Sequence, residues 1–179
     1  MTINAFANNK LEKITVDEKN ECFSNDQYGV LFNKDKTTLI YYPSYNPAQS
    51  YTVPKGVTSI GNSAFITAVN LESVILSDSV KRVGDYAFKD CDVLADVKIP
   101  YGVENIGKQA FYECNALLSI ELPDSVYELG SGAFSFCTNL ISIKLSKNIT
   151  HIKDSVFDGC NALSSIDIPS GVTQIDDSA

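Results

Sequence analysis

Apolar residues recur along this chain with a period of 23 residues. Each period carries a phenylalanine that follows a small residue, and in the last four periods a cysteine comes three residues later. The phenylalanines are Phe65, Phe88, Phe111, Phe134 and Phe157, and the cysteines are Cys91, Cys114, Cys137 and Cys160. A fixed period between about 20 and 50 residues predicts a stacked array in which each repeat contacts only its neighbours.

The first part of each period predicts a short strand. Residues 94–100, with the sequence LADVKIP, alternate so that Val97 faces inward while Asp96 and Lys98 face outward. Pro100 ends the segment because proline cannot donate a hydrogen bond to a strand ladder. Residues typical of turns occupy the next positions in every copy.

The second part of each period predicts a further short segment and a turn. Val103 and Ile106 indicate a second inward-facing stretch, and the apolar spacing over 107–114 predicts one helical turn. The predicted fold class is therefore an α/β repeat solenoid of short parallel strands and one-turn helices. Strands of successive copies are expected ~4.8 Å apart, in a curved sheet with the Ala-Phe turns on the opposite side.

We expect residues 1–179 to form one elongated domain. Regular copies span 71–93, 94–116, 117–139 and 140–162, followed by a partial copy over 163–179. A longer copy covers 11–70, and residues 1–10 match the tail of another. Both ends fall inside a repeat and lack the polar cap typical of a solenoid end. We therefore expect a fragment of a longer protein, with any secretion signal or anchor outside it.

Residues 17–50 lengthen the first copy and predict an inserted β-hairpin. Two apolar strands flank a polar tip at 34–37. Tyrosines concentrate here, and aromatic side chains are enriched in interface anchors. One interpretation is a recognition edge formed by Tyr41, Tyr42, Tyr45 and Tyr51. The other is that the hairpin needs a small core of its own, which these tyrosines supply.

One outward-facing strand position forms a second candidate binding surface. From copy to copy it is occupied by Thr15, Thr52, Ile75, Lys98, Glu121, Lys144 and Asp167. The sign of the charge alternates over the last four, so side chains on adjacent strands are expected to attract each other. One interpretation is a ladder of charges that pair with one another. The other is a docking surface for a partner, with Ile75, Lys98, Glu121, Lys144 and Asp167 as its candidate contacts.

Charge and hydropathy exclude several classes of partner. The net charge is −8 and the isoelectric point is about 4.5, which argues against nucleic acid. No apolar run approaches the roughly 20 residues that span a bilayer, so this segment is not expected to insert into a membrane. The first residues lack the basic and apolar regions of a signal peptide.

The recurring cysteines are predicted to pack in the core and not to bind a metal or form disulfides. Zinc needs four ligands that converge at ~2.3 Å, whereas a column stepping ~4.8 Å per copy keeps four sulfur atoms apart. Ala68 occupies the same position in the long copy, so we expect a ladder of buried, reduced thiols, with Cys22 packed inside the insertion. His151 lies between the inward-facing Ile149 and Ile152 and is expected to face solvent. No catalytic residue, metal site or cofactor is predicted.

The residues of one copy resemble a known family. Residues 117–137, LLSIELPDSVYELGSGAFSFC, closely resemble BspA-like leucine-rich repeats, and the resemblance covers essentially the whole chain. The fourth copy departs from the pattern at Ser146, Lys153 and Val156, which affects local turn geometry. The resemblance implies a leucine-rich-repeat horseshoe, an extracellular or cell-surface location, and adhesion or protein binding without enzymatic activity.

The sequence therefore predicts a non-catalytic module that binds a protein, such as a host or matrix component. Two alternatives remain open. The array could be a structural spacer that displays other domains, or it could be appended to a surface enzyme.

Overall fold

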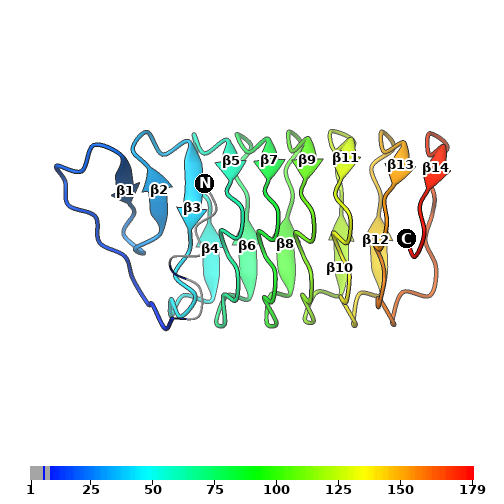
Figure 1. Cartoon of the computed structure of the whole chain (residues 1–179), viewed down its shortest axis with the longest axis horizontal. Coiled ribbons are helices and arrows are strands. Elements are labelled where there is room, and N and C mark those ends of the chain that lie inside the picture. Colours follow the sequence, from blue (N-terminus) through cyan, green and yellow to red (C-terminus); the bar gives the residue numbers. More distant parts are fainter. Residues whose placement is uncertain (1–5, 7–8) are drawn as a thin grey trace.

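The computed structural model describes residue 6 and residues 9–179. Most of the repeat tail predicted over residues 1–10 lies outside the described residues. The rest of the chain winds into coils that follow one another in a nearly straight row, so this view shows no pronounced horseshoe curvature (Figure 1). The architecture is a solenoid, as the 23-residue period predicts.

Each regular coil contributes one three-residue strand and one two-residue strand. The long strands are β4 (Ser50–Thr52), β6 (Ser73–Ile75), β8 (Asp96–Lys98), β10 (Ser119–Glu121) and β12 (Ser142–Lys144). The short strands are β5 (Ser59–Ile60), β7 (Arg82–Val83), β9 (Asn105–Ile106), β11 (Glu128–Leu129), β13 (His151–Ile152) and β14 (Gln174–Ile175). Figure 1 shows the long strands along one side of the stack and the short strands along another.

Between the regular coils, parallel pairing joins residues that lie 23 positions apart. Val74 pairs with Val97, and Ile60 pairs with Val83. In β8, Val97 is buried while Asp96 and Lys98 are exposed, as the alternating pattern predicts. The ladders are not continuous: the long strands form the sheets β4-β6-β8 and β10-β12, and β13-β14 is separate from the sheet that ends at β11.

The N-terminal end of the stack is an antiparallel addition. Strands β1 (Phe23–Asn25), β2 (Leu31–Asn33) and β3 (Thr38–Tyr41) pair in sequence order, and β3 then pairs in parallel with β5. The hairpin is thus present, with β1 as a third strand, and β3 also serves as the short strand of its own coil. The sheet continues from the hairpin into the solenoid without a break.

The repeat extends further toward the N-terminus than the phenylalanine spacing indicated. β4 pairs with β6 at an offset of 23 residues, and residues 48–70 follow the same apolar pattern as the later copies. Tyr42 lies 23 residues before Phe65, and the two rings stack with centroids 5.2 Å apart. Tyr42 therefore takes the phenylalanine position of the coil before residue 48.

A column of aromatic rings forms the centre of the core. The rings of Phe65, Phe88, Phe111 and Phe134 are fully buried. Their centroids lie 4.8, 5.1 and 5.2 Å apart, with interplanar angles of 11°, 2° and 1°. Since adjacent coils are separated by about the same distance, each ring contacts its equivalent in the neighbouring coil. Phe157 extends the column at 6.2 Å but is only partly buried.

The predicted one-turn helices are wrong, since the described residues contain no helix. The Ala-Phe turn is instead held by hydrogen bonds to the next coil. The N–H groups of Tyr86, Phe88 and Asp90 donate to carbonyl groups 22 residues further along, at 2.7–2.9 Å. Tyr86 and Asp90 have φ values of 58°. This left-handed conformation on both sides of Phe88 directs alternate N–H groups along the stack and prevents a helical turn.

A glycine after each of the short strands β5, β7, β9 and β11 lets the coils approach closely. A Cβ added to Gly107 would lie 2.6 Å from the backbone nitrogen of Asp85 and 2.6 Å from the carbonyl carbon of Gly84. The same position is occupied by Lys153 in the fourth copy, where the short-strand sheet is interrupted between β11 and β13. The interruption is consistent with the space that a side chain at this position needs.

We expect Gly107→Ala to destabilise the protein by about 1–3 kcal/mol, because its new methyl group meets fixed backbone atoms. The measurement is urea-induced unfolding followed by circular dichroism. Gly171→Ala is the matched control: its nearest neighbour is the Lys147 carbonyl oxygen at 3.3 Å, so the expected change is within about 0.5 kcal/mol. Equal losses in the two variants would contradict the close-approach argument.

Candidate functional site

The long-strand face consists of the outward-facing side chains of β4, β6, β8, β10 and β12. Ile75 lies between Thr52 and Lys98 in adjacent strands. Its side chain is 44% exposed, and the other two are also exposed. This part of the face combines an aliphatic group with a neighbouring cation. Lys98 forms no ion pair with any described residue.

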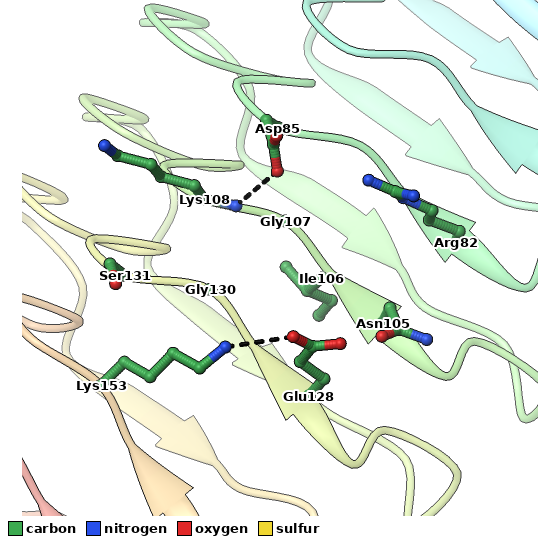
Figure 2. A pocket seen from close by; sticks show the side chains of 10 residues that line it. All are labelled: Arg82, Asp85, Asn105, Ile106, Gly107, Lys108, Glu128, Gly130, Ser131 and Lys153. Carbon is green, nitrogen blue, oxygen red and sulfur yellow. Dashed lines mark hydrogen bonds and ion pairs between the residues drawn. The ribbon is translucent and has the colours of Figure 1, made fainter.

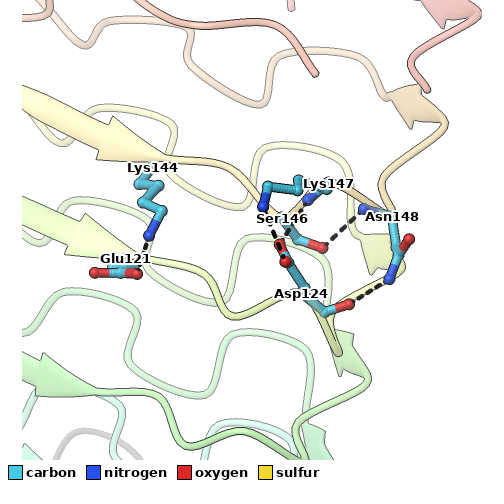
Figure 3. Close-up of polar contacts among 6 residues, drawn as sticks. All are labelled: Glu121, Asp124, Lys144, Ser146, Lys147 and Asn148. Atoms are coloured by element: carbon cyan, nitrogen blue, oxygen red, sulfur yellow. Dashed lines mark hydrogen bonds and ion pairs between the residues drawn. The ribbon is translucent and has the colours of Figure 1, made fainter. Parts of the chain in front are cut away.

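The charge ladder predicted on this face is present at one step. Lys144 pairs with Glu121 of the adjacent strand, as Figure 3 shows. Both side chains are largely exposed, and exposed pairs contribute only about 0–1 kcal/mol. Asp167 is exposed and lies in a segment without strand structure, so the predicted alternation does not extend to it among the described residues.

A second polar group lies beside this ion pair, where the fourth copy has serine in place of proline. Asp124 accepts the backbone N–H of Lys147 at 3.0 Å, and Lys147 Nζ lies 3.6 Å from Asp124 Oδ2 (Figure 3). The bonds from Lys147, led by that of its N–H group, lower the pKa of Asp124. Asn148 N–H donates to Ser146 Oγ at 3.1 Å. The departure from the repeat thus preserves the turn through polar contacts.

The long-strand face is divided by a groove between β8 and β10, which are not hydrogen-bonded to each other. The groove has a volume of about 400 Å³ and is lined by Asp96, Lys98, Ser119, Glu121 and Pro123, among others. Lys98 and Glu121 therefore lie on opposite sides of it. This division explains why the charge ladder has no pair at this step.

Of the two interpretations of the hairpin tyrosines, burial supports the small core for three of the four residues and not the recognition edge. Tyr41, Tyr42 and Tyr51 are only 1%, 1% and 3% exposed. Tyr51 donates a hydrogen bond to Asp26 Oδ2 at 2.6 Å and packs edge-on against Tyr42, and burial, followed by this bond, raises its pKa. These three residues form the small core of the N-terminal end. Tyr45 alone of the four is exposed, with Lys10 Nζ 5.8 Å from its ring centroid.

The four repeated cysteines are buried free thiols, as their spacing predicts. Each donates to the phenylalanine carbonyl of the preceding coil; for example, Cys114 Sγ lies 3.1 Å from Phe88 O. Burial raises the pKa of Cys91 and Cys137 to about 12 and that of Cys160 to about 11, and it raises the pKa of Cys114 as well. These thiols are therefore weak nucleophiles in the folded protein.

Two further expectations need correction. Cys22 is exposed and does not pack inside the insertion. His151 is half-buried and does not point freely into solvent, because its Nε2 atom lies 2.9 Å from Asp176 Oδ2 in the next coil. That contact lowers the pKa of Asp176. The pair links β13 to the coil of β14.

A polar groove that the sequence reasoning missed follows the short strands. We call it the trough. One half has a volume of about 410 Å³ and is lined by residues that include Arg82, Asn105, Gly107, Lys108 and Glu128. Figure 2 shows the guanidinium group of Arg82 directed toward Asp85 and Gly107, and Lys153 paired with Glu128 at the far end.

The other half of the trough has a volume of about 400 Å³ and runs toward the hairpin. It is lined by Asn33, Thr38, Ser59, Gly61 and Asn62, among others, and it shares Arg82 with the first half. Two features of the sequence could have revealed the trough. Glycine follows each of the short strands β5, β7, β9 and β11, and the first residue of each of these strands is polar.

Two kinds of feature are absent from the part of the chain that the structure describes. No group of three or more histidine, cysteine, aspartate or glutamate side chains is arranged to hold a metal ion there. Residue 6 and residues 9–179 also include no helix with the length and apolar character needed to cross a membrane.

Comparison with solved structures identifies bacterial repeat proteins with the same fold. The chain is similar to the pneumococcal vaccine antigen PcpA, with 29% identity and a TM-score of 0.82 over 92% of this chain and 45% of that one. It is similar to a leucine-rich cell surface protein of Faecalibacterium prausnitzii, with 32% identity and a TM-score of 0.82 over 88% and 41% of the two chains. A leucine-rich-repeat protein of T. pallidum has 25% identity and a TM-score of 0.61 over 89% and 85%.

The chain thus spans less than half the length of the first two structures. No curated protein sequence matches it. Residues 58–179 match the model of the BspA type leucine-rich repeat region, in six copies. With two strands in each regular coil, one column of phenylalanines and one of thiols, the chain belongs to the BspA-type leucine-rich-repeat family.

Proposed function

We propose that this chain is a non-catalytic protein-binding module that acts in adhesion at a cell surface or in the extracellular space. Family membership supports a binding role, since repeat solenoids commonly use their extended faces to dock partners. The location is supported by the two similar structures, of which one is a vaccine antigen and the other a cell surface protein. The partner we propose is a protein, such as a host or matrix component.

The observation that carries this proposal is the pairing of Ile75 with Lys98 on the long-strand face, beside the groove between β8 and β10. Ile75 is an aliphatic residue that is 44% exposed within the three-stranded sheet β4-β6-β8. Lys98 has no ionic partner among the described residues, so it is available to a carboxylate of another protein. An apolar centre with a charged rim is typical of protein interfaces.

Two other functions remain compatible with the family. A spacer would display other domains and would bind nothing through this face. An array appended to a surface enzyme would leave catalysis to residues outside this chain. Saturable binding by the isolated chain would favour our proposal over the spacer. The sequence of the full-length gene would show whether the array is attached to an enzyme.

The test is a screen of immobilised serum and matrix proteins, followed by titration of the strongest binder. We expect Ile75→Asp to weaken binding at least about tenfold, because it places an unpaired carboxylate at the centre of the interface. Ile175→Asp is the matched control, since Ile175 is 57% exposed but lies in β14, outside the long-strand face.

Binding that is equally weak in both variants, or unchanged in both, would refute the use of the long-strand face. No saturable binding to any protein in the screen would favour the spacer. Circular dichroism of each variant establishes that the fold is intact, and exposed substitutions of this kind are expected to change stability by about 0.5 kcal/mol or less.

A further inference from the structure

The trough combines a bare floor with two polar walls. Gly61, Gly84, Gly107 and Gly130 succeed one another at the same position of four coils, and each donates its N–H to the coil before it. At ~4.8 Å per coil, this glycine column is roughly 14 Å long. It ends at Lys153, which takes the glycine position of the next coil.

Both walls of the trough consist of polar residues. The short strands contribute Ser59, Arg82, Asn105 and Glu128, which occupy the same position in successive coils. The opposite wall contributes Asn62, Asp85, Lys108 and Ser131, one residue after each glycine. Hydrogen bonds fix part of this wall: Asp85 N–H donates to Asn62 Oδ1 at 3.0 Å, and Lys108 N–H donates to Asp85 Oδ1 at 2.9 Å.

The trough is cationic on a strongly acidic protein. Arg82, Lys108 and Lys153 oppose Asp85 and Glu128, so three positive and two negative groups leave a local charge of +1, against −8 for the whole chain. Lys153 is neutralised by Glu128, with their charged atoms 3.1 Å apart. Arg82, the single arginine of the sequence, lies where the two halves meet and forms no ion pair with any described residue.

From these observations we propose that the trough binds a linear polysaccharide that carries carboxylate groups, with one carboxylate held by Arg82. A guanidinium group matches the planar geometry of a carboxylate and binds it through two parallel hydrogen bonds. The hydroxyl and amide groups of Ser59, Asn105 and Ser131 supply donors and acceptors for sugar hydroxyls. Lys153 closes one end of the site.

The direction of the trough favours a sugar polymer over a peptide. It runs across the strands, so a peptide lying in it cannot add to the sheet as a further strand. Polar side chains of different kinds occupy the same position in successive coils, ~4.8 Å apart, which is about the length of one sugar ring, whereas an extended peptide advances ~3.3 Å per residue and falls out of step with them. A chain of sugar rings, one per coil, keeps its register. Among the described residues, no aromatic side chain lines either half of the trough, although Tyr127 lies beside it and accepts a hydrogen bond from Asn105 Nδ2 at 3.2 Å; aromatic anchors are typical of peptide and protein interfaces.

This surface is distinct from the long-strand face, so the proposal stands independently of the protein partner proposed above. The test is fluorescence anisotropy of a labelled galacturonic-acid hexamer with the whole chain at low ionic strength. We expect saturable binding that Arg82→Gln weakens about 10- to 100-fold, since the variant loses charged hydrogen bonds. Lys98→Gln makes the same change of charge on the long-strand face and is expected to leave binding unchanged.

Two competitors identify the chemistry of the occupant. The fully methyl-esterified hexamer has no carboxylate, and we expect it to compete weakly and equally in the wild type and Arg82→Gln. A hexaglutamate peptide carries the charges without the sugar register and is expected to compete poorly. The proposal is overturned if the acidic hexamer shows no saturable binding, if Lys98→Gln weakens it as much as Arg82→Gln, or if hexaglutamate binds as tightly as the sugar.

Discussion

Phe111→Ala is expected to lower the free energy of unfolding by about 3–5 kcal/mol, the range observed when large aromatic side chains are removed from well-packed cores. The ring is fully buried and stacks on Phe88 and Phe134 at 5.1 and 5.2 Å. Its removal leaves a cavity and breaks two ring–ring contacts. Because each coil contacts only its neighbours, the loss also weakens the coupling between the two halves of the stack.

Phe136→Ala is the matched control, since Phe136 is 40% exposed on the outer side of the same kind of turn. We expect its loss to be below about 1 kcal/mol. Phe157→Ala should fall between the two, because Phe157 is partly buried and its stacked neighbour is 6.2 Å away. Urea-induced unfolding followed by circular dichroism measures all three. A loss for Phe111→Ala no larger than that for Phe136→Ala would contradict a role for the ring column in stability.

The same column explains how much of the fold could be predicted. A period of 23 residues with Phe at a constant position requires equivalent residues to meet in neighbouring coils. Val97 and Phe111 are accordingly buried. The turn around each phenylalanine was not predictable in the same way. Its apolar spacing fits one helical turn equally well. The left-handed φ values occur at Tyr86 and Asp90, and glycine takes these two positions only once each, at Gly132 and Gly159, so the signal for this conformation is weak.

The tyrosines of the N-terminal end show a different limit. Tyr42 lies 23 residues before Phe65, and Tyr51 lies 23 residues before Val74, so the period placed both in the core. Their high local density left a surface recognition edge open beside a small core. Aromatic composition alone does not distinguish an interface from a small core, because both bury aromatic rings. Extending the period through the hairpin would have made the distinction.

Charge contacts depended on strand pairing that the sequence does not reveal. Glu121 and Lys144 meet because β10 and β12 are paired, whereas Lys98 and Glu121 are divided by the groove between β8 and β10. The trough was missed for a related reason. Gly107 was assigned to the start of the predicted helical turn over 107–114. The outward-facing position of the short strands, occupied by Arg82, was not followed from copy to copy.

The second large effect is expected in alkaline solution, where the protein should lose stability steeply above about pH 8.5. An unfolded chain releases its thiol protons near that pH, whereas the folded chain retains them, since burial raises the pKa of Cys91 and Cys137 to about 12. Between these values the unfolded state binds fewer protons, so the free energy of unfolding falls as pH rises. Below about pH 7 the thiols are almost fully protonated in both states and contribute almost no pH dependence.

Each thiol changes the free energy of unfolding by at most about 1.4 kcal/mol per pH unit. Four buried thiols together therefore remove on the order of 8 kcal/mol between pH 7 and pH 10, a large part of the stability of an ordinary domain. Urea midpoints at pH 7, 8, 9 and 10 measure the slope. Burial also raises the pKa of Tyr42 and Tyr51, which adds a further loss above about pH 10.

Single substitutions assign this slope to the thiol column. Cys114→Ala is expected to reduce it by about one quarter, and alanine suits the position because Ala68 occupies it in the coil over 48–70. Cys22→Ala removes an exposed thiol and is expected to leave the slope unchanged. In the native protein at neutral pH, a thiol reagent should label Cys22 rapidly and the four buried cysteines only after denaturant is added. The column is open to solvent if Cys114→Ala leaves the slope unaltered, or if all five thiols are labelled rapidly. In that case the phenylalanine rings, and not the buried thiols, stabilise the stack.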